Sequence, residues 1–129
     1  MNTKLLMAVS ASFLGLVGIA LSFLPQEVAN YCGLPQSSSI VLQVCGSLYF
    51  GFATLNWMAK GNLIGGIYSK PVAVANFAHF LIGGLALLKY TFPATITSYM
   101  WIPVVVYLAF AILFGYVLLF NPVPNTKAV

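Results

Sequence analysis

The residues of this sequence that could do chemistry are polar side chains inside apolar runs. The only histidine, His79, lies in the stretch "NFAHFLIGG". A polar group left bare in hydrocarbon costs several kcal/mol, so each of these side chains needs a partner or a function. The candidate ligand-binding residues are His79, Asn76, Asn56, Tyr49 and Gln43.

The polar residues share a predicted location. If the second and third apolar runs form an antiparallel hairpin about residue 66, Asn56 lies level with Asn76 and close to His79. A neutral imidazole has one donor and one acceptor, and the two asparagines could supply a partner. The cluster could tie helices together, anchor a small ligand between walls such as Tyr107 and Phe80, or relay protons. The sequence leaves these three roles open.

Composition places these residues in a membrane. Hydrophobic residues make up 61% of the 129 residues and charged residues 5%, and the mean hydropathy is +1.00. Soluble domains carry about 25% charged residues. Six charged side chains could not cover the surface of a water-soluble fold, so we expect lipid to be the main solvent of the chain.

Four apolar runs are long enough to cross a bilayer, which takes about 20 residues of helix. We expect an all-α, polytopic integral membrane protein, with four transmembrane helices in an up-down antiparallel bundle forming one domain over 1–129. The first run exceeds the usual apolar length of a signal peptide, so we expect it to be a retained span. The spans cover about 5–24, 39–59, 71–89 and 100–120. Between the first two, we expect a short amphipathic turn within 25–38.

Lysine placement predicts the orientation. Cytoplasmic loops of membrane proteins are enriched in Lys and Arg, so we expect a bacterial inner-membrane protein with both termini in the cytoplasm. Without arginine or a clustered basic face, nucleic acid is not an expected partner. The predicted cytoplasmic side carries Lys4, Lys60, Lys70 and Lys127, and the other side carries Lys89 and the only acid, Glu27. The aromatic residues expected to anchor the span ends are Trp57, Trp101, Tyr68, Tyr90 and Tyr99.

Small residues form one stripe along the first span. Steps of three and four residues place them on one helix face, and small residues let helices approach closely in lipid. This stripe, called the small-residue seam, could form a dimer interface or pack against another span of the same chain. Its residues are Ala8, Ala11, Gly15, Gly18 and Ser22, and the third span carries Gly83 on the face of its polar pair.

Several activities lack their usual residues. Ion-coupled transport usually needs an ionisable Asp, Glu, Lys or Arg inside the membrane, and no span carries one at its middle. Cys32 and Cys45 form no CxxC pair, so neither a metal site nor a dithiol centre is expected. We expect no cofactor and no catalytic residue.

Three functions remain open. The first is an accessory or structural protein that associates with itself or another membrane protein through helix packing. The second is a binder of a lipid or quinone-like ligand, anchored by Asn76 and His79. The third is an oligomeric channel or passive transporter lined by Gln43, Asn56 and Asn76.

Overall fold

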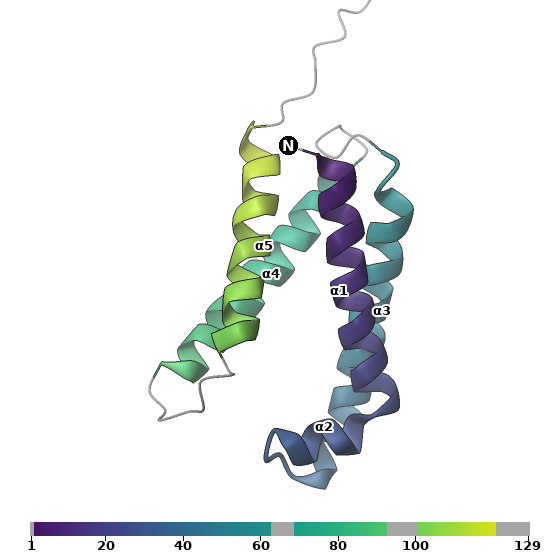
Figure 1. The fold of residues 1–129 in the computed structure, drawn as a ribbon, viewed down its shortest axis with the longest axis vertical. Helices are drawn as coiled ribbons and strands as arrows, with labels where there is room; N and C mark the ends of the chain where they lie inside the picture. Colours follow the sequence, from purple (N-terminus) through teal and green to yellow (C-terminus); the bar gives the residue numbers. More distant parts are fainter. Residues whose placement is uncertain (1, 63–68, 93–100, 121–129) are drawn as a thin grey trace, which may run out of the picture. The chain divides into compact units, whose positions relative to one another are not determined.

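The regular secondary structure of the described residues consists of helices. The computed structural model describes residues 2–62, 69–92 and 101–120, and no strand occurs among them (Figure 1). The elements are α1 (Thr3–Phe23), α2 (Pro25–Tyr31), the 3-10 helix η1 (Gln36–Ser38), α3 (Ser39–Ala59), α4 (Lys70–Thr91) and α5 (Trp101–Phe120).

The helices α1, α3, α4 and α5 are long and apolar enough to cross a membrane, as expected of a membrane protein. Each begins and ends within two residues of its predicted bounds. The predicted all-α class and the four long apolar helices are therefore confirmed. The charged and aromatic residues Lys127, Tyr68 and Tyr99 lie outside the described residues.

Local signals explain the helix ends. The Asn2 side chain accepts a hydrogen bond from the Leu5 backbone N–H at 3.1 Å and so caps α1. Pro25 then begins α2, the predicted short turn, because proline fits a first helical position where no N–H partner is needed. Gly33, with φ at +68°, turns the chain toward η1 in a conformation that favours glycine.

The chain divides into two compact units, which are Asn2–Gly61 and Asn62–Val129. The first, the N-terminal unit, holds α1, α2, η1 and α3. The second, the C-terminal unit, holds α4 and α5. In the N-terminal unit, α3 runs back along α1 after the bend formed by α2 (Figure 1).

Glycines bring α1 and α3 into backbone contact. A Cβ atom on Gly18 would lie 2.7 Å from Phe50 N and 3.0 Å from Gly46 O. Reciprocally, a Cβ atom on Gly46 would lie 2.9 Å from Gly18 O and 2.8 Å from Ser22 N. These distances leave no room for a side chain at either position. The Gly18 and Ser22 part of the seam thus packs within the chain.

The C-terminal unit packs through aromatic rings. Phe80 of α4 is fully buried, and its ring centroid lies 4.7 Å from that of Phe110 and 5.8 Å from that of Phe114, both of α5. A Cβ atom on Gly83 would lie 2.7 Å from Tyr107 Cε1. Glycine on α4 therefore makes the space that a ring of α5 fills.

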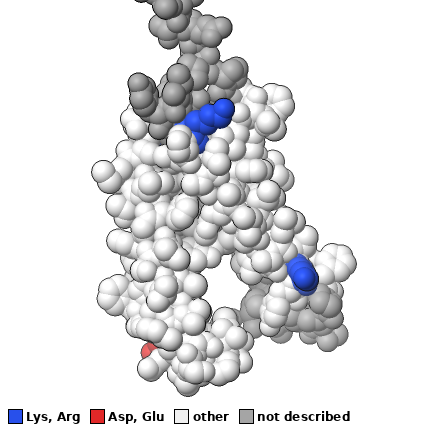
Figure 2. All heavy atoms as spheres, turned by 180° about the vertical axis from the view of Figure 1, so that it is seen from behind, with Lys and Arg blue, Asp and Glu red and all other residues white. Residues whose placement is uncertain are grey.

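The outer faces of the long helices carry large apolar side chains. Leu16 of α1 is 71% exposed, Ile82 of α4 is 68% exposed and Ile112 of α5 is 72% exposed. Water would solvate such surfaces poorly, whereas lipid chains solvate them well. Charged atoms on the face that Figure 2 draws lie near the ends of helices. This distribution fits an apolar solvent around the middle of each helix.

A stability measurement tests the α1–α3 contact. Replacing Gly18 by alanine forces a methyl group against the α3 backbone, so we expect Gly18→Ala to lower the free energy of unfolding by about 1–3 kcal/mol. Gly51 serves as the matched control, because a Cβ atom added there would have no neighbour within 4 Å. Gly51→Ala should be neutral or slightly stabilising. Unfolding followed by circular dichroism in detergent micelles compares the two; equal losses would contradict the contact.

Candidate functional site

A buried polar pair joins α1 to α3. Asn56 Nδ2 donates a hydrogen bond to Ser10 Oγ at 3.1 Å, and both side chains are fully buried. The Ser10 hydroxyl in turn donates to the carbonyl oxygen of Met7 at 3.0 Å. Asn56 was predicted from the sequence as a site residue, whereas Ser10 was not. Serine commonly bonds its own helix backbone, so nothing in its sequence position distinguishes Ser10 from Ser12.

Asn76 lies fully buried on α4. Its Nδ2 atom donates to the carbonyl oxygen of Val72, one turn earlier, at 2.9 Å. Asn56 belongs to the N-terminal unit, whereas Asn76 and His79 belong to the C-terminal unit. The predicted cluster of these three residues therefore stays a prediction.

His79 lies among aromatic rings of the C-terminal unit. Its ring centroid is 5.1 Å from that of Phe80 and 5.7 Å from that of Tyr107. Phe80 and Tyr107 are 5.4 Å apart in an edge-on arrangement. The structure thus brings together the histidine and two of the aromatic residues expected to wall a pocket. Its ligand-binding role stays a prediction.

The other two predicted site residues lie on α3. Gln43 is exposed, and its Nε2 atom donates to the carbonyl oxygen of Ser22 at 3.4 Å, a long bond that ties α3 to α1. Tyr49 is partly buried. Both residues belong to the N-terminal unit, and their membership of one site with His79 stays a prediction.

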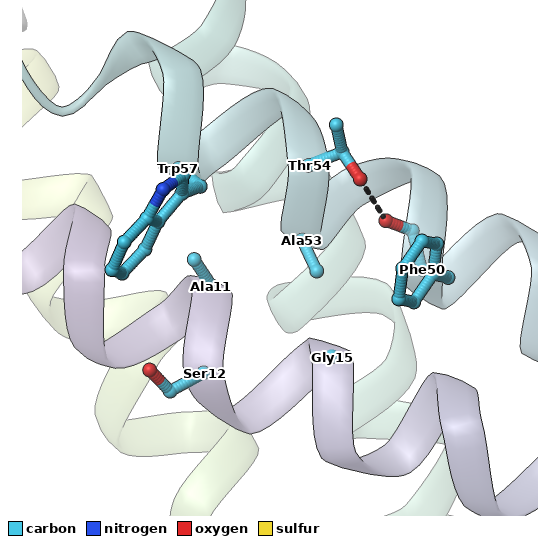
Figure 3. Close-up of a pocket in the computed structure, with 7 residues that line it drawn as sticks. All are labelled: Ala11, Ser12, Gly15, Phe50, Ala53, Thr54 and Trp57. Atoms are coloured by element: carbon cyan, nitrogen blue, oxygen red, sulfur yellow. Dashed lines mark hydrogen bonds between the residues drawn. The ribbon is translucent and has the colours of Figure 1, made fainter.

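A groove of about 240 Å³ opens between α1 and α3. Figure 3 shows Trp57 and Phe50 at its two ends, with Ala11 and Ala53 between them. The hydroxyls of Ser12 and Thr54 donate to carbonyl oxygens of their own helices, so the groove offers a ligand mainly apolar contacts. This α1–α3 groove is lined by Ala11, Ser12, Gly15, Phe50, Ala53, Thr54 and Trp57.

The α1–α3 groove was not predicted from the sequence, although Ala11 and Gly15 were expected as small residues of the seam and Trp57 as an interface anchor. The groove exists because Ala11, Gly15 and Ala53 leave a floor that the rings of Phe50 and Trp57 do not fill. Because the floor combines residues of two helices, the sequence pattern of neither helix alone predicts it.

A second groove of about 440 Å³ lies between α4 and α5 in the C-terminal unit. Its lining is wholly apolar apart from the Tyr116 hydroxyl. The lining residues are Phe77, Leu81, Leu108, Ala111, Ile112, Gly115, Tyr116, Leu119 and Phe120.

Within the described ranges, no three His, Cys, Asp or Glu side chains are grouped so that they could hold a metal ion. Cys32 is an exposed thiol and Cys45 a partly buried one, and they form no disulfide. No protein-family model, curated protein or solved structure matches this chain.

A double-mutant cycle tests the polar pair. Hydrogen bonds between membrane helices contribute about 0.5–2 kcal/mol, so we expect a coupling energy in that range between Ser10→Ala and Asn56→Ala. Ser12, which bonds its own helix, provides the control. Its pairing with Asn56→Ala should give a coupling near zero. Unfolding in detergent measures each variant, and equal coupling for Ser10 and Ser12 would refute an interhelical bond.

Proposed function

We propose that this protein is an integral membrane protein that crosses a bacterial inner membrane four times and acts by helix–helix association. In this proposal α1, α3, α4 and α5 are the crossings of one up-down antiparallel bundle, with both termini in the cytoplasm. The protein has an accessory or structural role and associates with itself or with another membrane protein.

The observation that carries this proposal is the outward apolar surface of all four long helices. Large side chains such as Leu16, Leu48 and Ile112 are more than half exposed, although each lies in the middle of a helix. Inside a bilayer these faces are available to lipid and to other membrane helices. Association in lipid depends on packing between such faces, because the hydrophobic effect does not drive it there.

Charge distribution supports the orientation. Lys4 lies in the first turn of α1 and Lys60 directly follows α3, so both occupy the same end of the N-terminal unit. Glu27 lies in α2, at the other end. The lysine-bearing end belongs in the cytoplasm by the preference of basic residues for that side.

Thiol labelling in intact cells tests the crossings and their direction. Cys32 is exposed next to α2, so a membrane-impermeant maleimide added outside should label it in a Cys45→Ala variant. A Gly61→Cys variant without the two native cysteines places the thiol beside Lys60. It should react only after the membrane is permeabilised. Labelling of both thiols from the same side would contradict the proposed arrangement.

Photo-crosslinking in native membranes tests the association. A photoreactive phenylalanine analogue replaces Leu16, Leu48, Ile82 or Ile112 in turn, so that every long helix carries one probe on its exposed face. We expect one helix face to give a discrete protein adduct or a dimer, while the others react only with lipid. Lipid adducts alone from all four positions would refute association through these faces.

The contacts of His79 with Phe80 and Tyr107 favour binding of a small amphipathic molecule as the second candidate function. Such a ligand would copurify with the unaltered chain and be lost in His79→Leu. The channel alternative has less support, because the Asn56 and Asn76 amides are fully buried and donate to protein acceptors.

A further inference from the structure

We propose that the α1–α3 groove binds an anionic phospholipid, with one acyl chain lying in the groove and the phosphate beside Lys60. This inference rests on the proposed insertion of α1 and α3 in a membrane, and it adds a defined lipid site to the helix faces discussed above.

The shape of the groove fits a narrow apolar chain. Trp57 and Phe50 are seven residues apart on α3, so the groove extends about 10 Å along the helix at about 1.5 Å per residue. The floor of Ala11, Gly15 and Ala53 admits close approach along this whole length. Because the hydroxyls of the lining are bonded to their own helices, the occupant needs no hydrogen-bonding groups within the groove.

The charge at one end of the groove selects the headgroup. Trp57 lies in the last turn of α3, and Lys60 Nζ is 2.9 Å from the centroid of its ring. Lys4 adds a second positive charge at this end, since α1 begins where α3 ends. The only acidic side chain, Glu27, lies in α2 at the opposite end of the unit.

No acidic side chain of the protein therefore balances Lys4 and Lys60 at this end. An anionic phosphate at the membrane surface can do so, and a lysine near such a surface favours anionic over neutral lipid by about fivefold. The ring of Trp57 sits between the charge and the apolar groove, which is the usual place of tryptophan at a membrane interface. The anionic headgroup of such a lipid matches the lysine-bearing end, and its extended acyl chain matches the apolar groove.

Tryptophan fluorescence provides the test. Trp57 and Trp101 are the only tryptophans, so a full-length Trp101→Phe protein reports on the groove alone. It is reconstituted into phosphatidylcholine vesicles containing a minor fraction of phosphatidylglycerol. Bromine atoms, which quench tryptophan on contact, are placed on the acyl chains close to the headgroup of either lipid. The two quenching curves give the relative association constant at Trp57.

We expect about a fivefold preference for phosphatidylglycerol over phosphatidylcholine. Lys60→Gln should reduce the ratio toward one. Lys89→Gln makes the same charge change in the last turn of α4, in the C-terminal unit, and should leave the ratio unchanged. Gly15→Leu, which directs a side chain into the groove, should lower quenching by the anionic lipid. Gly51→Leu adds the same side chain to an open surface of α3 and should not.

Four results would overturn the site. They are a ratio of one in the starting protein, equal effects of Lys60→Gln and Lys89→Gln, a Gly15→Leu variant with undiminished quenching, and a protein adduct in place of lipid adducts when the photoreactive phenylalanine analogue replaces Phe50 of the groove. Quenching by neither lipid would refute insertion itself, and the labelling pattern of Cys32 would then fail as well. Quenching by both lipids to the same extent would leave insertion standing and refute only the selective site.

Discussion

The close contact between the backbones of α1 and α3 at Gly18 and Gly46 determines the rest of the N-terminal unit. A Cβ atom on either glycine would lie only 2.9–3.0 Å from the carbonyl oxygen of the other, which is closer than van der Waals contact allows. With the helices this close, Asn56 reaches Ser10 two to three turns away along the interface. Between helices in lipid, a hydrogen bond of this kind contributes only about 0.5–2 kcal/mol, and van der Waals packing also drives association. The Asn56–Ser10 bond sets the register of α1 against α3, and the two glycines set the distance between the helices.

The C-terminal unit packs its two helices with different side chains. There, glycines of α4 and α5 face aromatic rings instead of backbone: Gly83 accommodates Tyr107, and Gly115 accommodates Phe77. Phe80 stacks with both Phe110 and Phe114 and is fully buried. Rings cover more area than small residues, so the α4–α5 pair is held by broad apolar contact while the α1–α3 pair is held by close approach. His79 lies at the edge of this ring cluster and so has aromatic neighbours on its own helix and on α5.

Much of the fold was predictable because a helix long enough to cross a bilayer leaves a plain pattern in a sequence, a run of about 20 apolar residues. The length and apolar composition of each run located α3 at residues 39–59 and the other long helices within two residues. The seam also predicted close packing at Gly18 and Ser22. Its partner was not predictable, because steps of three and four residues describe one helix face and say nothing about the helix opposite. For the same reason Asn56 was found as a buried polar residue, whereas its acceptor Ser10 was not.

Among the candidate site residues, the sequence predicted only those groupings in which the spacing along a single helix places the side chains together. Asn76 and His79 are one turn apart on α4, and their common face follows from spacing alone. The α1–α3 groove depends on an absence of side-chain volume at Ala11, Gly15 and Ala53, contributed from both helices, and on two rings that frame it. Small residues permit the Gly18–Gly46 contact, and other small residues one to two turns along the pair leave the space of the groove between the rings of Phe50 and Trp57. Close packing at one level and an apolar groove at the next therefore both follow from small residues on the facing sides of α1 and α3.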